Sequence, residues 1–269
     1  MTTRHIDGST RLYGIIGDPV SAVRSPEVFN AMFERLGINA VMVALHVGAG
    51  DLAAAWAGLK TLRNLDGLIF TMPHKVAATA LVDDLGQTGR IVGAINAARR
   101  EPDGRWTGDM FDGRGCVQGL RAQGHEVAGR KAFLLGVGGA GAAIAVAFAE
   151  AGIGTLVVQD LDAAKRDRVV ARISSDFPGV AVRSGVLADE AFDLAVNATP
   201  LGMKGGDPLP FDPAGLPAST LVVDVVPKPE VTALLERAAA TGHRIQTGRH
   251  MHLGQAIGVA RFFGLTVED

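Results

Sequence analysis

The sequence predicts an α/β fold made of two domains, each with a mostly parallel sheet. Short apolar runs alternate with helical stretches along both halves of the chain, which is the pattern of parallel strands joined by crossover helices. Glycine is abundant, at 35 residues, whereas aromatic residues make up only 5% of the chain, so tight turns are favoured over a ring-filled β-sandwich. The 269 residues, 48% of them hydrophobic, are enough to bury the cores of two modest domains.

The first half of the chain, residues 11–112, begins the alternation. Ser25 followed by Pro26 resembles a helix cap with proline at the first helical position, and Asp51 is a plausible cap of a second helix. The predicted elements are a strand at Leu12–Gly17, a helix at Ser25–Leu36, a strand at Val41–His46, a helix at Asp51–Arg63, a strand at Gly67–Thr71 and a helix at Val76–Leu85.

A second series of strands and helices begins near Gly129. Four prolines and three glycines within Met203–Pro217 predict a loop there, and the boundary between the two halves is expected within Gly113–Gly129. The predicted elements are a strand at Lys131–Leu135, a helix at Ala140–Ala151, a strand at Thr155–Gln159, a charged helix at Ala163–Asp176, and strands at Val180–Val182, Leu194–Asn197 and Leu221–Val225.

The charge and hydropathy patterns exclude two classes of partner. A formal net charge of −2 gives no broad attraction to nucleic acid or anionic lipid, and the basic cluster around Lys165 is interspersed with acids. The apolar run Ala132–Ala149 approaches the length of a membrane span, but its clustered glycines indicate a strand, a turn and a helix. Met1–Arg11 lacks the apolar segment of a secretory signal. We expect no nucleic-acid or membrane partner and predict no particular oligomeric state.

Cysteine and histidine usage points away from disulfides and metals. Cys116 is the only cysteine, so an intramolecular disulfide is excluded and a reducing cytoplasm fits best. His74, His250 and His252 have no accompanying cluster of acids or cysteines, so ordinary loop or helix histidines are the better interpretation and no metal is predicted. His252 and Gln255 are three residues apart on a predicted helix and therefore share a face.

A glycine-rich turn at Gly136–Gly141 carries the first functional prediction. The pattern G-x-G-x-x-G follows a buried strand and precedes a small-residue helix, and the next strand ends at Asp160, close to the spacing of about 20 residues expected for a ribose-binding carboxylate. This context predicts a Rossmann-type doubly wound domain that binds a dinucleotide, with the pyrophosphate at the helix N-terminus. The alternative is a tight turn that binds nothing.

Several short motifs follow one another along nearly the whole chain. They are Gly17–Pro19 with Ser25 and Pro26, Thr71–Lys75 (T-x-P-x-K), Gly93–Asn96 (G-A-x-N), Asp112 with Gly113, the turn Gly136–Ala143, Asn197–Met203, Asp224 with Pro229 and Thr232, and Gln255 within Met251–Ala256. Each motif is short, but seven or more in this order are difficult to obtain by chance. In these motifs the chain resembles the shikimate/quinate dehydrogenase family.

The resemblance implies a division of the chain and a reaction. It implies an N-terminal α/β substrate domain, residues 1–112 and 249–269, to which the C-terminal helix returns, and a Rossmann domain, residues 113–248. It implies an oxidoreductase of aromatic amino acid biosynthesis that transfers a hydride between a nicotinamide coenzyme and the secondary alcohol or ketone of a small molecule, a shikimate- or quinate-like cyclic hydroxy acid.

The resemblance also assigns roles to residues by motif position. Lys75 and Asp112 match the catalytic pair, and oxidation of an alcohol does require a group that takes the hydroxyl proton. The implied substrate-binding residues are Ser25, Thr71, Asn96 and Gln255. The expected coenzyme-binding residues are Gly136, Gly138, Gly139, Ala140, Gly141, Asp160, Asn197, Thr199 and Pro200. Without the motifs, Lys75 reads as a solvated lysine and Asp112 as a helix cap.

Five positions depart from the family pattern, and most of them belong to the substrate pocket. Val23 stands where the family has the first serine of S-x-S-P, and Ile69 stands where it has an asparagine. Met110 and Phe111 replace the first two residues of N-T-D, and Pro227 replaces a tyrosine. Polar contacts to a hydroxylated ring therefore become apolar, so we expect poor activity with shikimate itself and a preference for a ring acid with fewer or differently placed hydroxyls.

The coenzyme prediction rests on the end of the second Rossmann strand. Many NADP-dependent family members carry Asn-Arg-Thr there, whereas this chain has Gln159–Leu161. A carboxylate at Asp160 is expected to accept hydrogen bonds from the ribose of NAD and to repel the 2′-phosphate of NADP. The sequence therefore predicts NAD as the preferred coenzyme, with NADP less favoured. The alternative is that Asp160 only caps the following helix.

A non-catalytic sensor that binds such a metabolite on the same fold is the alternative function. Folds host many functions, so the fold alone does not separate the two. The retained Lys75 and Asp112 favour catalysis, and the sequence contains no helix-turn-helix or basic extension that would serve a sensor as an output domain.

Overall fold

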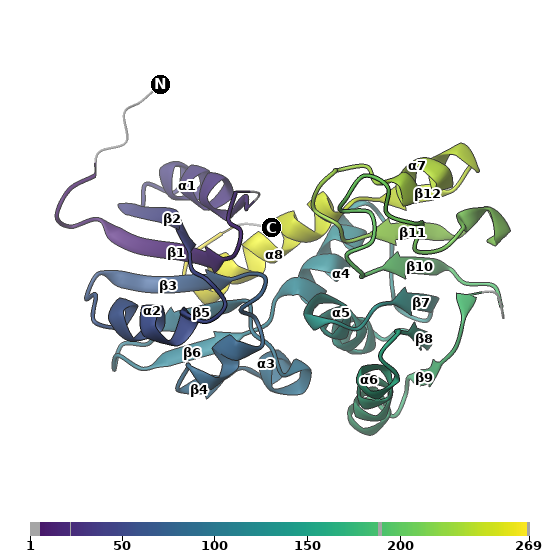
Figure 1. Cartoon of the computed structure of the whole chain (residues 1–269), viewed down its shortest axis with the longest axis horizontal. Helices are drawn as coiled ribbons and strands as arrows, with labels where there is room; N and C mark the ends of the chain where they lie inside the picture. Colours follow the sequence, from purple (N-terminus) through teal and green to yellow (C-terminus); the bar gives the residue numbers. More distant parts are fainter. Residues whose placement is uncertain (1–5, 22, 188–189, 268–269) are drawn as a thin grey trace. The chain divides into compact units, whose positions relative to one another are not determined.

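The computed structural model describes residues 6–21, 23–187 and 190–267, so the first five residues of the N-terminal segment considered above lie outside the described part. The chain forms two compact units (Figure 1). Unit 1 comprises Met1–Phe111 and Ala256–Asp269, and unit 2 comprises Asp112–Gln255. The second division falls inside helix α8 (Gly248–Phe262), whose last residues belong to unit 1. The predicted α/β fold with a returning C-terminal helix is confirmed.

Unit 1 contains a six-stranded mixed sheet in the order β2-β1-β3-β5-β6-β4 (Figure 1). β1 lies parallel to β2 and β3, whereas β5 is antiparallel to both β3 and β6. The strands are β1 (Arg11–Gly17), β2 (Ala40–His46), β3 (Leu65–Phe70), β4 (Asp84–Leu85), β5 (Ala97–Arg100) and β6 (Trp106–Asp109), and the helices are α1 (Ser25–Arg35), α2 (Leu52–Leu59), the 3-10 turn η1 (Ala77–Ala80) and α3 (Gln87–Val92).

Two apolar clusters cover the two faces of this sheet. Tyr13 packs in one cluster with Phe29 and Phe33 of α1, and Ile16 packs in the other with Trp56 of α2. Side chains at odd and even positions of a strand point to opposite faces, which explains why β1 contributes to both clusters. A strand buried on both faces reads as a continuous apolar run, as Leu12–Ile16 largely does.

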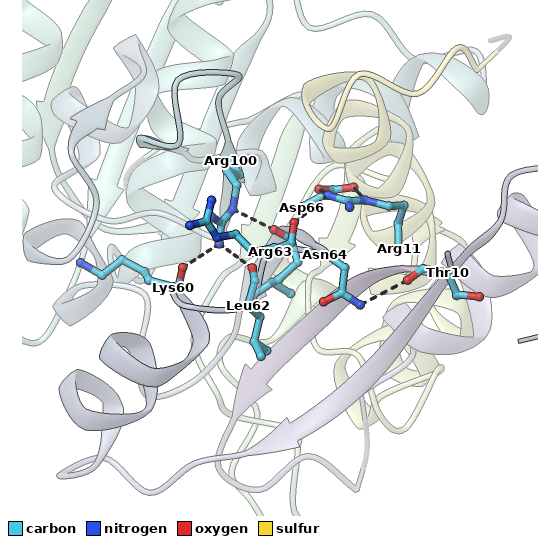
Figure 2. A network of polar contacts seen from close by, with 9 residues as sticks. Thr10, Arg11, Lys60, Leu62, Arg63, Asn64, Asp66 and Arg100 are labelled. Carbon is cyan, nitrogen blue, oxygen red and sulfur yellow. Dashed lines mark hydrogen bonds and ion pairs between the residues drawn. The ribbon is translucent and has the colours of Figure 1, made fainter. Parts of the chain in front are cut away.

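An arginine network holds the connection between α2 and β3 (Figure 2). Arg100 donates to the carbonyl oxygens of Leu65 at 3.0 Å and of Lys60 and Leu62 at 2.9 Å, and its guanidinium lies 5.0 Å from the Trp106 ring. An ion pair joins Arg11 to Asp66, and Asn64 donates to the Thr10 carbonyl oxygen at 3.4 Å. These bonds hold a connection that has no secondary structure of its own.

Unit 2 contains a six-stranded parallel sheet in the order β12-β11-β10-β7-β8-β9 (Figure 1). Read from β9, this is the 3-2-1-4-5-6 order of dinucleotide-binding domains, with its switch point between β7 and β10. The strands are β7 (Lys131–Leu135), β8 (Thr155–Gln159), β9 (Ala181–Ser184), β10 (Leu194–Asn197), β11 (Leu221–Asp224) and β12 (Arg244–Gln246), and the helices before α8 are α4 (Asp112–Ala122), α5 (Gly139–Glu150), α6 (Ala163–Asp176), the 3-10 turn η3 (Pro213–Gly215) and α7 (Ala233–Ala240).

Some predicted elements of unit 1 are wrong. Val76–Leu85 forms η1 and the short strand β4 instead of one helix. Ser25 is the first residue of α1 rather than its cap, and the side chain of Asp51 makes no cap hydrogen bond to α2.

In unit 2, the expected boundary segment Gly113–Gly129 contains most of α4. Glycines of this segment allow α4 to pack closely against other helices, so the segment is not a linker.

Candidate active site

The turn between β7 and α5 has the backbone that its glycines predict. Gly136 has a φ of +90°, in the left-handed region that favours glycine, and a Cβ there would lie 3.0 Å from the Thr199 nitrogen. At Gly141 a Cβ would collide with the Gly136 carbonyl oxygen, so this glycine lets the helix begin directly against the turn. The fold of the turn itself therefore requires both glycines.

Gly138 differs because no protein atom requires a glycine at that position. It is exposed, it is the N-cap of α5, and a Cβ built on it would meet no atom within 4 Å. Because glycine has no side chain, this N-cap supplies no acceptor to the N–H groups of the first helical turn. Gly139 and Ala140 are the first residues of that turn. Open space above uncapped helix N–H groups is the environment that a pyrophosphate fits, so the turn suits a dinucleotide.

Asp160 follows β8 and uses both carboxylate oxygens on the backbone. Its Oδ2 accepts from the Val137 nitrogen at 2.7 Å, and its Oδ1 accepts from the Asp162 nitrogen at 2.8 Å. The cap of α6 is Asp162, whose side chain accepts from the Lys165 nitrogen at 3.1 Å. Asp160 therefore ties the glycine turn to the start of α6 and is not the cap of that helix.

The segment after β10 lies against the glycine turn. Asn197 is fully buried, Thr199 is half-buried and Pro200 is exposed. Asn197 donates to the Asp224 carboxylate, and burial raises the pKa of the Asp224 carboxyl while its three hydrogen bonds act in the opposite direction. The side chain of Asn197 is therefore not exposed at the surface of the site, and it acts on the glycine turn through the residues that it contacts.

In unit 1, the motif residues follow the strands that end at one edge of the sheet. Thr71 directly follows β3; its N–H donates to the Ile16 carbonyl oxygen at 2.9 Å, and its methyl group lies where a side chain on Gly17 would be. Lys75 is half-buried, and its carbonyl oxygen accepts from the Ile95 nitrogen at 2.9 Å. Main-chain bonds to neighbouring elements therefore hold the T-x-P-x-K motif.

Asn96 and Ser25 occupy different environments in the same unit. Asn96 is fully buried between β3 and β6, where its side-chain oxygen accepts from the Phe111 nitrogen at 2.9 Å. Ser25 is half-buried at the start of α1. The burial of Asn96 indicates that its carbonyl oxygen is committed to the backbone that leads to Asp112.

Asp112 and Gln255 meet in unit 2 although 143 residues separate them. The Gln255 side chain donates to the Asp112 carboxylate at 2.9 Å, and Asp112 is almost completely buried. Glycines make this approach possible: a Cβ on Gly115 of α4 would lie 2.6 Å from the Gln255 nitrogen, and one on Gly254 would lie 2.6 Å from the Gly115 oxygen. The α4–α8 crossing thus places the first and last site residues of unit 2 side by side.

The histidines have ordinary partners. His74 is buried and its Nε2 lies 2.7 Å from the Val47 carbonyl oxygen, and the His252 Nδ1 lies 3.4 Å from the Gln255 Oε1, on the face that the sequence predicts. Within residues 6–21, 23–187 and 190–267, no three histidine, cysteine or acidic side chains are arranged to hold a metal ion. No helix in that same part of the chain has the length and apolar character of a membrane span.

Sequence reasoning missed two features of unit 2. Asp224 and Thr232 were assigned only to a motif, yet they form a buried hydrogen bond of 2.6 Å at the edge that carries the glycine turn. Gly115 and Gly119 of α4 lie in the segment where the sequence predicts the boundary between the two halves. Glycines three to four residues apart before a second glycine-bearing helix are a signal of close helix packing, and they were available in the sequence.

Comparisons with known proteins agree with this architecture. The family described as "Shikimate dehydrogenase substrate binding domain" matches residues 15–98. A shikimate dehydrogenase (NADP(+)) of Rubrobacter xylanophilus is 40% identical over 97% of this chain and 93% of its own length. Among solved structures, shikimate 5-dehydrogenase from Listeria monocytogenes in complex with shikimate and NAD has a TM-score of 0.88 at 30% identity, and covers 97% of this chain and 94% of its own.

A second solved structure, quinate dehydrogenase from Corynebacterium glutamicum in complex with NAD, has a TM-score of 0.83 at 28% identity and covers 95% of this chain and 94% of its own. The matches extend through both units and define a two-domain oxidoreductase. The chain belongs to the shikimate dehydrogenase family. The family and the class of reaction predicted from the motifs are confirmed, and no finding favours the alternative of a sensor.

The predicted preference for NAD is wrong. The Rubrobacter protein and further curated relatives, from Acidiphilium cryptum, Rhodospirillum rubrum and others, are named as NADP(+) enzymes. The geometry of Asp160 gives a physical reason for the error. Both of its oxygens accept backbone N–H groups, so the carboxylate holds the turn, and its spacing from the glycines does not by itself select NAD over NADP.

Proposed function

We propose that this protein transfers a hydride between NADP(H) and the secondary alcohol or ketone of a shikimate-like cyclic hydroxy acid. Lys75 and Asp112 are the proposed catalytic pair. Ser25, Thr71, Asn96 and Gln255 are the proposed substrate-binding residues, with Asn96 acting from a buried position through the backbone of Phe111. The sole cysteine, Cys116, is free and buried, which raises the pKa of its thiol to about 12. A chain with one cysteine and no disulfide fits a reducing cytoplasm, which is the proposed compartment.

The observation that carries the proposal is the hydrogen bond between Gln255 and Asp112. Both residues were selected from separate motifs at distant points of the sequence, and the fold of unit 2 brings their side chains to 2.9 Å. The contact orients the Asp112 carboxylate from a residue of a separate motif.

The proposed reaction transfers a hydride and a proton to different acceptors. In alcohol oxidation, the C–H bond of the carbinol carbon breaks, and when bound the coenzyme accepts the hydride. The hydroxyl proton passes to the Lys75 amine, and in ketone reduction the Lys75 ammonium returns it to the carbonyl oxygen. Asp112 is the proposed acceptor that orients the substrate. The main-chain bond from Ile95 to Lys75 keeps the base of this side chain in place.

The glycine turn and the start of α6 are the proposed coenzyme site. Gly138, Gly139 and Ala140 would hold the pyrophosphate, and Gly136 and Gly141 keep the turn tight. Arg166 is the proposed partner of the 2′-phosphate: it donates to Asp167 at 2.8 Å, and its pKa is raised mainly by Asp167, with a contribution from Asp160. The charge of Asp160 thus interacts with the Arg166 guanidinium. The positive charge of Arg166 offsets the repulsion between the Asp160 carboxylate and a phosphate.

The substrate is proposed to be a ring acid with a less polar edge than shikimate. Ile69 and Phe111 are buried in the cluster around Tyr13, and the half-buried Val23 packs against the same cluster. Met110 is fully buried and offers no polar atom either. These family positions therefore supply no polar side-chain atom, and a substrate hydroxyl that depends on one loses a partner at a cost of about 1–3 kcal/mol.

A coenzyme-reduction assay across cyclic hydroxy acids, including shikimate, quinate and analogues lacking one hydroxyl, tests the proposed function. We expect turnover with NADP⁺ for at least one of them, and higher kcat/KM for an analogue than for shikimate. Saturable binding of a ring acid without turnover of any panel member would favour the sensor and overturn the enzyme assignment. A shikimate kcat/KM of roughly 10⁵ M⁻¹s⁻¹ or more would overturn the substrate preference only.

A further inference from the structure

A buried chain of hydrogen bonds runs behind the glycine turn in unit 2. β10 and β11 pair in parallel with Asn197 opposite Asp224, so the two side chains project on the same face of the sheet at its carboxyl edge. Both residues are at most 1% exposed. Neither side chain therefore meets solvent, and each depends on the other for its hydrogen bonds.

The Asp224 carboxylate accepts three hydrogen bonds from three different segments. Its Oδ1 accepts from the Asn197 side chain at 3.1 Å and from the Val226 nitrogen at 3.0 Å, and its Oδ2 accepts from the Thr232 hydroxyl at 2.6 Å. An ionised carboxylate only accepts hydrogen bonds, so the NH₂ side of the Asn197 amide must face it. Asp224 thereby fixes which way the Asn197 amide points.

The fixed amide then orders the segment that follows β10. The Asn197 Nδ2 also donates to the Leu201 carbonyl oxygen at 3.2 Å. Its Oδ1 accepts from both the nitrogen of Thr199, at 3.1 Å, and the hydroxyl of Thr199, at 2.7 Å. The Thr199 hydroxyl in turn accepts from the Leu201 nitrogen at 3.2 Å. A reversed amide would place its oxygen against the Leu201 carbonyl oxygen and its NH₂ group against the Thr199 nitrogen.

The ordered segment forms the floor of the glycine turn. The Ala198 nitrogen donates to the Leu135 carbonyl oxygen at 2.8 Å, and the backbone of Thr199 and Ala198 lies at 3.0 Å from the position of a Cβ on Gly136. The turn therefore rests on backbone whose position is set by Asn197. A change in the orientation of that amide moves the surface on which the coenzyme turn is built.

We infer that Asp224 is a positioning residue for coenzyme binding: it acts through Asn197 and Thr199 and sets the floor of the Gly136–Gly141 turn without touching the coenzyme. The inference rests on the proposed function, because it takes this turn to be the coenzyme site. Removal of the carboxylate frees the Asn197 amide and leaves its donor without a buried acceptor. Substitution by asparagine keeps one oxygen for Asn197 and Val226 and offers an N–H to the Thr232 oxygen.

The test is the equilibrium Kd for NADPH, followed by coenzyme fluorescence in the full-length protein. We expect Asp224→Ala to raise the Kd about tenfold and Asp224→Asn to restore it to within about twofold of the unsubstituted protein. The KM of the coenzyme is expected to rise in parallel, while kcat at saturating coenzyme stays unchanged. Asp193→Ala is the matched control, because Asp193 also accepts a backbone N–H, from Lys131 at 2.9 Å, but at the opposite edge of the same sheet. Its Kd is expected to be unchanged.

A double-variant cycle separates action through Asn197 from a general loss of structure. If Asp224 acts through Asn197, Asn197→Ala alone raises the Kd by a similar factor, and the double variant raises it no further. If Asp224→Ala does not fold, the Asn197→Ala and Asp224→Asn proteins carry the test. An additive double variant, or an unchanged Kd in Asn197→Ala, overturns the inference. Absence of NADPH binding by the unsubstituted protein would instead overturn the proposed function.

Discussion

The two sheets of the molecule hold their site residues by different means. At the edge of the unit 1 sheet, main-chain bonds to Ile16 and Ile95 fix Thr71 and Lys75 of the T-x-P-x-K motif, and the buried side chain of His74 adds a contact to the Val47 carbonyl oxygen. At the edge of the unit 2 sheet, the glycine turn rests on the buried side chains of Asn197 and Asp224. In unit 1, a side chain such as that of Lys75 is expected to act in the reaction. In unit 2, the side chains of Asn197 and Asp224 are expected to set the position of the glycine turn.

This difference predicts which kinetic constants each substitution changes. In unit 1, substitutions at motif side chains should alter kcat or substrate recognition and leave coenzyme affinity alone. In unit 2, substitutions at the buried network should alter coenzyme affinity and leave the chemical step alone.

The largest effect is expected at Lys75. Replacement of Lys75 by alanine removes the proposed proton-transferring group, so kcat should fall by about 10²–10⁴. Lys60→Ala is the control, because Lys60 is an exposed lysine of the same unit that follows α2, and it should leave kcat unchanged. Steady-state rates at saturating substrate and coenzyme measure both. An unchanged kcat for Lys75→Ala removes this residue from the mechanism.

A gain of activity is expected when a family serine is restored at position 23. Val23→Ser supplies a hydroxyl where the family pattern has one, and a recovered polar contact is worth roughly 5- to 150-fold in kcat/KM for shikimate. Val43→Ser, on the exposed side of β2, adds the same hydroxyl elsewhere in unit 1 and should change nothing. If the two variants behave alike, position 23 does not contact the substrate.

A smaller effect is expected at the start of α6. Arg166→Ala removes the proposed partner of the 2′-phosphate at a half-buried site, so the Kd for NADPH should rise by about fivefold. Arg168→Ala removes an exposed arginine of the same helix and serves as the control. The same titration with NADH should show no difference between Arg166→Ala and the unsubstituted protein. A loss of affinity for both coenzymes would mean that Arg166 supports the fold rather than reading the phosphate.

The smallest functional effect is expected from the arginine network of unit 1 (Figure 2). Arg100 donates to three carbonyl oxygens, and Arg100→Lys cannot reproduce this fork with one ammonium. The free energy of unfolding should fall by about 2 kcal/mol, while the NADPH Kd stays constant. Urea denaturation followed by circular dichroism measures the first quantity. A lysine variant as stable as the original would show that the charge alone suffices.

The sequence predicted unit 2 better than unit 1, for a physical reason. The strands Lys131–Leu135, Thr155–Gln159 and Leu194–Asn197 have the predicted bounds, because each is a buried apolar run ended by a turn. In unit 1, β5 and β6 contain arginine, glycine and aspartate residues rather than an apolar run, and their hydrogen-bond partners lie on other strands and loops. Their pairing depends on tertiary contacts such as those of Arg100, and local periodicity contains no information about them.

The candidate site shows the same limit. Motif positions predicted Lys75 and Asp112, but only the fold shows that Gln255 reaches Asp112 over 143 residues. The spacing of Asp160 from the glycine turn predicted a preference for NAD, and that prediction is wrong because a spacing does not reveal which donors a carboxylate meets. In the structure those donors are the backbone nitrogens of Val137 and Asp162.

The division of roles between the two units is tested most directly by the NADPH Kd of the Lys75→Ala protein. Lys75 belongs to unit 1 and is proposed to act on the substrate hydroxyl alone, so the Kd should stay within about twofold of the unsubstituted protein although kcat falls by about 10²–10⁴. Fluorescence titration of NADPH measures this without turnover. A Kd that rises in proportion to the loss of kcat would contradict the account, because Lys75 would then act by binding the coenzyme.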